Sequence, residues 1–290
     1  MKKCICFLLS YIFLTHYSFA ECKFADWFEY EQNYKENKVA HSKVYGIKKH
    51  EIPGLAYVFR VNTLGINADG APNAYSYEDH QALQGKCPSK EKYHYRGLDC
   101  PANAGYKIKG MKWQNVLVVD KSTGDAFVRQ SGEYKGFLVA KTRLQDPKIV
   151  DETDKNKWVN SDVVPYWTFP GQTSFSLKEG TGRVGDIGYV INKKTGKSSA
   201  FIIADVGGSA TAFGEVSLQL ARNLGAKNPD PIRGGDIDGD YYFVIFPKTG
   251  MTPLWPVSNL TIEKIAEERL SKVGGINAIT SCQGFKFISK

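Results

Sequence analysis

The stretch "IGYVINKKTGKSSAFIIAD", from Ile187 to Asp205, decides the fold. Two apolar runs, Ile187–Asn192 and Ser199–Asp205, flank the segment "NKKTG" at Asn192–Gly196. Short runs rich in β-branched and aromatic residues on either side of a glycine-containing turn are typical of a β-hairpin. The stretch therefore predicts two antiparallel strands, of which the second ends at an acid.

The same pattern of short apolar runs, broken by Gly, Pro, Asn and Asp, continues outward from this hairpin. Many short strands with frequent turns indicate a mostly β protein, a barrel or a sandwich, and not alternating βαβ units. The further strands are expected at Leu55–Val61, Asn115–Asp120, Ala126–Arg129, Gly136–Lys141, Tyr166–Phe169 and Tyr241–Phe246.

A few helices are expected at the periphery. One is predicted from Glu215 to about Leu224, and another from about Ile262 to Val273, with Thr261 as its N-cap. We divide the chain into an N-terminal extension with some helix (21–54), one catalytic-size barrel (55–250) and a C-terminal helical extension packed on the barrel (251–290).

Residues 1–20 predict a secretory signal peptide. Lys2 and Lys3 precede the apolar core Cys4–Leu14, and the segment from Ser18 to Ala20 has the small residues of a cleavage site. An uncleaved anchor is the alternative. No other apolar run has the length needed to span a bilayer. We therefore expect a secreted or periplasmic protein without a membrane anchor.

The charge of the chain is mildly basic. The net charge is +8, and loss of Lys2 and Lys3 with the signal peptide, together with no acid, lowers it to +6. A basic exported protein favours anionic surfaces such as a cell wall, although surface lysines also serve solubility. Nucleic acid is not expected as a partner, because no block of Lys and Arg is interleaved with aromatic residues.

Four cysteines remain after the signal peptide, and an even number in an exported chain predicts two disulfides. Three pairings are possible, and we favour the local pair Cys87–Cys100 with a clasp, Cys22–Cys282, that joins the ends. No metal or other cofactor is expected, because no C-x-x-C or paired histidine spacing occurs. The "DIDGD" segment at Asp236–Asp240 is interpreted as a structural turn, because it lacks the downstream Glu of a calcium loop.

Two acids flank a glycine-rich loop and are the candidate catalytic pair. Asp205 ends an apolar strand, where partial desolvation would raise its pKa and suit it to proton transfer. Glu215 follows Gly214 at a predicted helix start. Each acid has a structural alternative: Asp205 as a turn residue, and Glu215 as an acid favoured by the helix dipole. Together they could face each other across a groove, as glycoside hydrolysis requires.

The loop "NADGAPNAY" at Asn67–Tyr75 places Asp69, Asn73 and Tyr75 around a Gly and a Pro. Its default interpretation is a structural turn, but the same residues suit a sugar-binding loop. Sugars require planar polar groups together with an aromatic face. Four aromatic residues could provide that face if they are not in the core: Tyr75, Tyr77, Tyr166 and Trp167.

Several quoted stretches occur in one order along the chain: "NADGAPNAY", "LDCPANAG", "GFLVAKTRLQD", "VVPYWTFPG", "RVGDIGYVINKKTG", "AFIIADVGGSATAFGEVSLQLARNLG" and "YYFVIFPKTG". In this order they resemble family 75 glycoside hydrolases, the fungal-type endo-chitosanases and their bacterial relatives. The resemblance covers about Val58 to Gly250. It implies Asp205 and Glu215 as the catalytic residues, and Asp186 as a substrate contact.

The chain departs from this family at three places in the expected groove. Asn67 stands where an acid is expected, and Gly208 stands where family members often have a proline. The loop before Glu215 carries "GSATAF" in place of a more charged segment. These departures concern the substrate more than the fold.

A second resemblance bears on the fold. "ADVGGSATAFGE" is similar to a stretch of membrane-bound lytic transglycosylase A and related double-psi barrel enzymes, which cleave peptidoglycan. It implies a six-stranded double-psi β-barrel. By this analogy the second acid, Glu215, is the proton donor, which leaves Asp205 as the general base.

The expected function is that of a secreted, monomeric, endo-acting glycoside hydrolase that cuts β-1,4 bonds of a chitosan-like amino-sugar polymer by an inverting mechanism. The alternative is a peptidoglycan-cleaving enzyme on the same barrel. A non-catalytic carbohydrate-binding protein is a third class. The basic charge fits peptidoglycan better, since chitosan is itself cationic.

Overall fold

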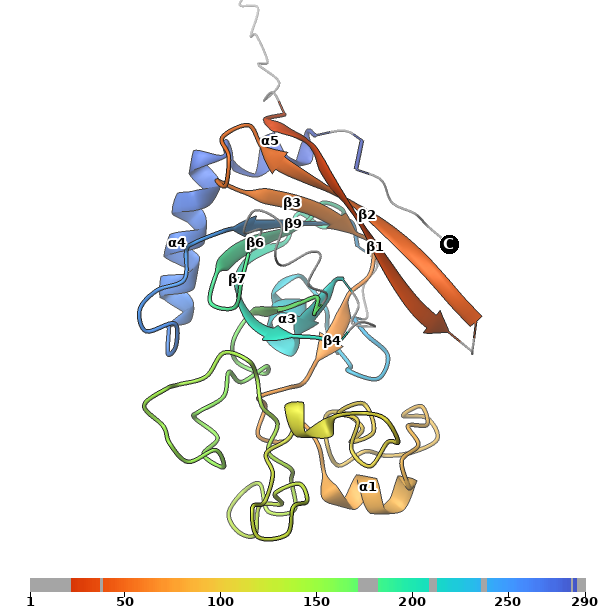
Figure 1. Ribbon diagram of the computed structural model, residues 1–290. Coiled ribbons are helices and arrows are strands. Elements are labelled where there is room, and N and C mark those ends of the chain that lie inside the picture. The colour runs from red at the N-terminus through yellow and green to blue at the C-terminus, as the bar shows by residue number, and fades with distance from the viewer. Residues whose placement is uncertain are drawn as a thin grey trace, which may run out of the picture.

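The computed structural model describes residues 22–36, 39–171, 182–208, 213–235, 239–282 and 284–285. The predicted signal peptide lies outside the described residues. The chain is mostly β, with one mixed sheet of nine strands and a few helices (Figure 1). The strands are β1 (Phe24–Glu36), β2 (Val39–His50), β3 (Tyr57–Val61), β4 (Gly65–Asn67), β5 (Tyr166–Phe169), β6 (Ile187–Asn192), β7 (Ser198–Val206), β8 (Glu215–Ser217) and β9 (Tyr241–Phe246).

The predicted central hairpin is confirmed as β6 and β7, which pair antiparallel from Ile187 opposite Ile202 onward. Its turn is closed by the Gly196 N–H, which donates to the Asn192 carbonyl at 2.8 Å. Gly196 has a φ of 74°, a left-handed conformation that glycine adopts without steric cost. The local sequence therefore specifies the turn, and pairing of β6 with β9 and of β7 with β5 adds to the stability of the hairpin.

The sheet runs in the order β1-β2-β3-β9-β6-β7-β5-β8-β4. Most pairs are antiparallel, but β5 pairs with β7 and β4 pairs with β8 in parallel. Within the described residues the nine strands do not close, which differs from the expected six-stranded barrel. The parallel pairs matter most for function, because they bring the ends of β4, β5, β7 and β8 to one place.

Both faces of the central strands are buried, which explains their continuous apolar runs. In β9, Phe243 and Ile245 pack into a cluster that holds Trp167 and Phe213. The alternate residues of β9 pack into a second cluster, which helix α4 (Asn259–Lys272) covers. Side chains on a strand alternate between faces, so a strand with two buried faces shows no polar alternation.

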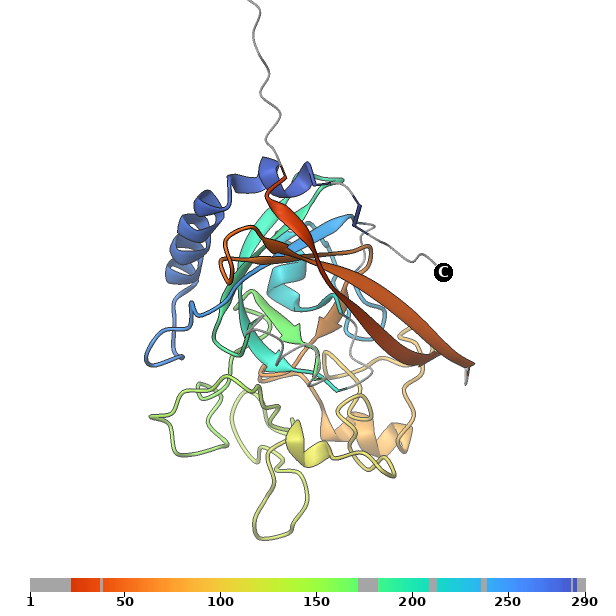
Figure 2. The same ribbon diagram turned by 45° about the horizontal axis from the view of Figure 1, so that its top comes forward.

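The helix expected in the N-terminal segment was wrong, because most of its described residues are in strands. The segment forms a long antiparallel hairpin of β1 and β2, which extends along one side of the molecule (Figure 2). Tyr30 is buried and stacks against Phe213, with ring centroids 5.1 Å apart. The many polar residues of the hairpin conceal its strands, because only one face packs on the core.

The helices also differ from their expected bounds. Helix α3 (Leu218–Asn223) begins after Glu215, with Ser217 as the N-cap; the Ser217 side chain accepts a hydrogen bond from the Leu220 N–H at 3.1 Å. Helix α4 (Asn259–Lys272) is capped by Ser258 and not by Thr261. The other helical segments in the described residues are α1 (Tyr77–Leu83), the 3-10 turn η1 (Trp113–Asn115) and α5 (Gly275–Thr280). None of the helices in the described part of the chain is long and apolar enough to cross a membrane.

A loop-rich region, residues 68–165, lies beside the sheet and carries α1 and η1 (Figure 1). The strands expected here at residues 115–120, 126–129 and 136–141 are replaced by isolated bridges, such as Leu117 with Ala140 and Val119 with Ala126. A small core of its own, which includes Tyr106 and Leu138, holds the region together. The apolar positions were identified correctly, but the turns between them leave no room for regular strands.

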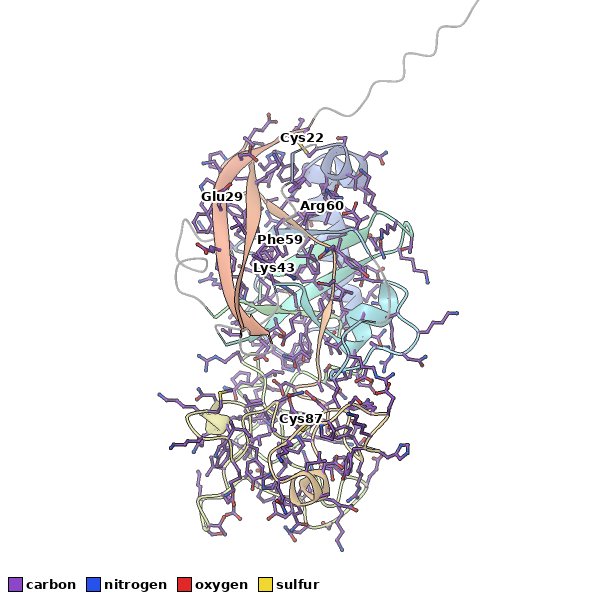
Figure 3. The ribbon with its side chains drawn as sticks, turned by 90° about the vertical axis from the view of Figure 1, so that its right-hand side faces the viewer. Cys22, Glu29, Lys43, Phe59, Arg60 and Cys87 are labelled. Atoms are coloured by element: carbon purple, nitrogen blue, oxygen red, sulfur yellow. A yellow bond between two sulfur atoms is a disulfide. The ribbon has the colours of Figure 1, made fainter. Side chains whose placement is uncertain are left out.

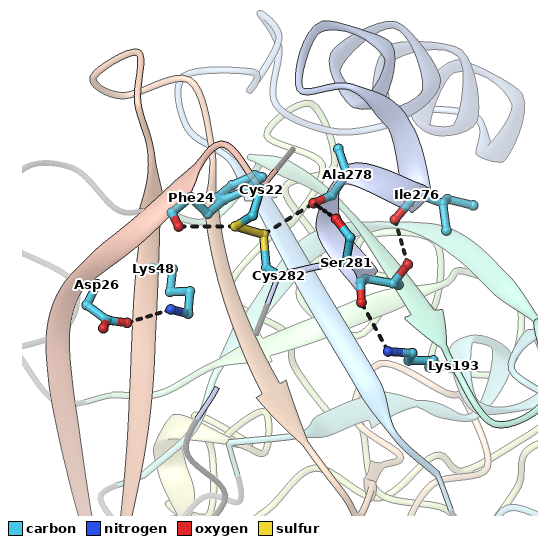
Figure 4. Close-up of a disulfide and its surroundings, with 10 residues drawn as sticks. Cys22, Phe24, Asp26, Lys48, Lys193, Ile276, Ala278, Ser281 and Cys282 are labelled. Atoms are coloured by element: carbon cyan, nitrogen blue, oxygen red, sulfur yellow. Dashed lines mark hydrogen bonds and ion pairs between the residues drawn. A yellow bond between two sulfur atoms is a disulfide. The ribbon is translucent and has the colours of Figure 1, made fainter. Parts of the chain in front are cut away.

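Both predicted disulfides are present. Cys22 and Cys282 join the start of β1 to the end of α5 across 260 residues, with their Cα atoms 4.9 Å apart (Figure 4). Cys87 and Cys100 close a short segment of the loop-rich region. Cys22 lies at the end of the sheet far from the loop-rich region, which contains Cys87, so the two crosslinks stabilise different parts of the molecule (Figure 3).

Candidate functional site

A cleft of about 860 Å³ lies where the sheet meets the loop-rich region. The ends of β4, β7 and β8 form its base, and residues of the loop-rich region form its wall. Its lining contains acids from both parts: Asp69, Asp99, Asp205 and Glu215. Residues far apart in the sequence therefore converge on one open site.

Asp205 lies near the end of β7, where β5 runs parallel and places Thr168 beside it. Its side chain is buried, and its Oδ1 accepts a hydrogen bond from the Arg143 backbone N–H at 3.1 Å. Burial raises the pKa of Asp205 to about 6, although the backbone N–H groups of Val206 and Arg143 lower it. Asp205 is thus mostly ionised at neutral pH, yet able to take up a proton.

Glu215 is the first residue of β8, directly across from Gly65 of β4. Because helix α3 starts only at Leu218, the helix dipole expected to stabilise an ionised Glu215 does not act on it as predicted. Burial raises the pKa of Glu215 to about 7, and the negative charge of Asp205 also raises it. Glu215 therefore holds its proton at a higher pH than Asp205 does.

The side chain of Asn67 connects the two acids. Its Nδ2 donates to Glu215 Oε1 at 2.8 Å and lies 3.3 Å from Asp205 Oδ2 and 3.1 Å from Thr168 Oγ1. Its Oδ1 accepts from the Asp69 N–H at 2.6 Å and from the Tyr166 hydroxyl at 2.9 Å. Two donors on the oxygen side fix the orientation of the amide, so that the NH₂ group must face the carboxylates.

Asp69 is a third buried acid beside this pair. Tyr75 donates its hydroxyl to Asp69 Oδ1 at 2.9 Å, and Tyr166 donates to the Asp69 carbonyl at 3.0 Å. Burial, and then the charge of Asp205, raise the pKa of Asp69 well above its usual value. The next residue, Gly70, has a φ of 78°, and a Cβ there would collide with the Val159 carbonyl, so the loop requires glycine.

The predicted site residues divide into two groups. Asp205, Glu215, Asp69 and Tyr75 line the cleft, and the Tyr166 hydroxyl contacts both Asn67 and Asp69 beneath it. The structure does not place the other three in the cleft: Asn73, Trp167 and Asp186.

These three residues have other surroundings. Trp167 is fully buried in the aromatic core, and its Nε1 donates to the Phe213 carbonyl at 3.1 Å, so it offers no face to a sugar. Asp186 is also buried and accepts from the backbone N–H groups of Arg183, Thr249 and Gly250. Asn73 lies in the turn of the loop, where its carbonyl accepts from the Leu98 N–H.

Sequence reasoning missed several residues of the site. Asn67 was noted only as a departure from the expected acid, and Asp99 and Arg143 were quoted within motifs without a role. Burial raises the pKa of Asp99 to about 6, and its Oδ1 accepts from the Asn103 side chain at 2.7 Å. The presence of Asp99 and Arg143 in the ordered motifs was the one signal that could have singled them out.

The "DIDGD" segment is described only in part, since Asp236, Ile237 and Asp238 lie outside the described residues. Asp240 forms an ion pair with Arg60, at 2.5 Å to Nε and 2.8 Å to Nη2. In the described ranges, no group of three or more His, Cys, Asp or Glu side chains is arranged to hold a metal ion. Asp240 thus has a structural partner.

No protein-family model matches the chain, and no curated protein matches it.

Proposed function

We propose that the protein is a secreted, endo-acting glycoside hydrolase that cleaves β-1,4 bonds of an amino-sugar polymer. The observation that carries the proposal is the shared hydrogen bonding of Asp205 and Glu215 to one Asn67 amide at the base of an open cleft. Two carboxyl groups with different pKa values, about 6 and about 7, suit a base and an acid that work together.

In this mechanism Glu215 is the general acid and Asp205 the general base. Between the two pKa values Glu215 is mostly protonated and Asp205 mostly ionised. Glu215 donates its proton to the glycosidic oxygen as the bond from that oxygen to the sugar C1 breaks. Asp205 accepts a proton from the water whose oxygen forms the new bond to C1. The family resemblance implies the same roles for the two acids. Here the roles are argued from the pKa values, which burial raises.

The spacing of the acids bears on the stereochemistry. One oxygen of each acid lies within 3.3 Å of the Asn67 nitrogen, so the two carboxyl groups are close neighbours. Inverting glycosidases hold their carboxyl groups ~6.5–9.5 Å apart, which leaves room for the attacking water. Retaining enzymes use ~5–5.5 Å, with the second carboxylate attacking the sugar directly. We keep the inverting mechanism as the proposal, and the anomer released first, read by NMR, decides between the two.

A double-psi β-barrel around the site remains part of the proposal, supported by the parallel pairing of β4 with β8 and of β5 with β7. Export to the cell exterior or the periplasm is supported by the two disulfides, because such crosslinks persist in oxidising compartments.

The test is incubation of the purified protein with chitosan, chitin and peptidoglycan, followed by assay of new reducing ends and of muropeptides. Glu215→Gln and Asp205→Asn should each lower turnover by on the order of a hundredfold or more. Glu263→Gln, an exposed acid on α4, is the matched control and should keep full activity.

The alternative, a lytic transglycosylase, needs no water and predicts a different result. Its activity on peptidoglycan would fall with Glu215→Gln but survive Asp205→Asn, and its products would lack a new reducing end. Near-normal activity of both variants on every polymer would remove the case for either enzyme.

A further inference from the structure

One wall of the cleft is basic. Lys112, Lys141 and Arg143 all line it and all come from the loop-rich region, whereas Asp205 and Glu215 come from the sheet. Arg143 also donates its backbone N–H to Asp205, so its side chain begins next to the proposed general base. The cationic wall therefore adjoins the place where we propose that the bond is cut.

These cations are not neutralised by salt bridges. In the part of the chain that the structure describes, no carboxylate lies within salt-bridge distance of Lys112, Lys141 or Arg143. Lys141 donates from its Nζ to the Gln114 carbonyl at 2.6 Å, which holds the side chain in place without cancelling its charge. Lys112 and Arg143 are exposed to solvent.

The acids of the cleft carry less negative charge than their number suggests. Burial raises the pKa of Asp69 well above its usual value and that of Glu215 to about 7, so both hold their protons to higher pH than exposed acids do. Lys112, Lys141 and Arg143 line the same cleft as these acids. A polymer of free amines would meet like charge along this wall, whereas a polymer with acidic groups would be attracted to it.

We propose that Lys112, Lys141 and Arg143 form an anion subsite that binds a carboxylate carried by the glycan next to the bond that is cut. This inference rests on the proposed function and narrows its substrate to an acidic amino-sugar polymer. The carboxylate could belong to the sugar ring, as in a uronic acid, or to an ether-linked side group. Arg143 offers a planar, two-pronged donor that matches either carboxylate.

The experiment measures binding to oligosaccharides of equal length at low and at high salt. The probes are a glucosamine hexamer, an N-acetylglucosamine hexamer, an alternating N-acetylglucosamine–glucuronic acid hexamer, and a peptidoglycan glycan hexamer freed of its peptides. The glucosamine hexamer is cationic, and the N-acetylglucosamine hexamer is neutral. The last two carry the carboxylate on the ring and on a lactyl ether, so they distinguish its two sources.

We expect at least one acidic hexamer to bind about tenfold or more tightly than the neutral one, and we expect salt to weaken this preference. Arg143→Gln and Lys112→Gln should each reduce binding of that hexamer by about three- to tenfold, while binding of the neutral hexamer stays unchanged. Lys121→Gln is the matched control, because Lys121 is exposed but does not line the cleft.

The anion subsite would be overturned if both acidic hexamers bound no more tightly than the neutral hexamer. It would also be overturned if Lys121→Gln lost as much binding of the acidic hexamer as Arg143→Gln and Lys112→Gln. Cleavage of a neutral or cationic polymer in that case leaves the proposed hydrolase intact. Conversely, salt-sensitive binding of an acidic hexamer without cleavage of any polymer supports the subsite and refutes the hydrolase. The two proposals can therefore fail separately.

Discussion

The Nδ2 atom of Asn67 lies 2.8 Å from Oε1 of Glu215, which is the shortest of the three side-chain contacts of that nitrogen. The hydrogen bond lowers the pKa of Glu215 against the stronger effect of burial, and a similar contact lowers the pKa of Asp205. Asn67 therefore helps to set the proton affinity of both acids, as a positioning residue between them.

The first prediction concerns the pH dependence of Asn67→Ala. The kcat/KM of the wild type should have a bell-shaped pH profile. Its acidic limb should lie at pH about 6, the pKa of Asp205, and its basic limb at pH about 7, the pKa of Glu215. Loss of the donor removes stabilisation of both carboxylates, so both limbs should move to higher pH in a profile of kcat/KM. Asn115→Ala, a change at the cleft rim with no contact to the acids, should leave the limbs in place. If both limbs of the Asn67→Ala profile stay at the wild-type pH, the Asn67 amide does not affect the pKa values of Asp205 and Glu215.

The second prediction concerns the stability of Glu215→Gln. The folded pKa of Glu215, about 7, is above its unfolded value, so the folded state binds this proton more tightly. The resulting stabilisation is present at low pH and is lost as the pH rises through about 7. Because Gln is neutral throughout, Glu215→Gln should melt a few degrees higher than wild type at pH ~8, with the difference narrowing toward pH ~5. Glu263→Gln should show no such trend, and a variant that is less stable than wild type at high pH would contradict the expected sign.

The third prediction concerns Asp186, which is buried below the loop that follows β9. Asp186→Ala leaves the N–H groups of Arg183, Thr249 and Gly250 without their acceptor, which should lower the free energy of unfolding by roughly 2 kcal/mol or more. Asp186→Asn keeps one acceptor oxygen and should lose less. Urea denaturation measures both. The KM of folded protein should stay at the wild-type value, and an increase without loss of stability would restore Asp186 as a substrate contact.

The fourth prediction compares the two disulfides. Cys22 and Cys282 are 260 residues apart, and Cys87 and Cys100 are 13 apart. A crosslink restricts the unfolded chain more when it closes a longer loop, so the double serine variant of the long pair should lose about 5–6 kcal/mol and that of the short pair about 3 kcal/mol. Denaturant titration of the two variants tests the order. A smaller loss for the long pair would indicate that the unfolded chain already keeps its ends together.

Local patterns predicted the parts of the fold that local physics determines. The β6–β7 hairpin has its own turn chemistry, and the buried run of β9 can only be a strand or a short core segment. The hairpin of β1 and β2 was missed because its strands are stabilised by pairing with each other and by packing on one face. Neither contact leaves a strong signal in a polar sequence.

The two acids of the candidate site were predictable, but the link between them was not. Asp205 and Glu215 stand ten positions apart around one loop, so a single stretch of sequence contains both. Asn67 is 138 residues from Asp205 and 148 from Glu215 along the chain, and only the parallel pairing of β4 with β8 brings it to them. Long-range pairing of this kind is set by the whole sheet, so no local pattern can reveal it.

The bond between Cys22 and Cys282 makes the chain from one cysteine to the other a closed covalent ring. A single cut anywhere inside this ring leaves both pieces attached to each other as one molecule. Release of a fragment requires a second cut or a reductant, so a protease in an oxidising environment must act twice. A nicked chain should therefore migrate as two bands on a reducing gel and as one band on a non-reducing gel.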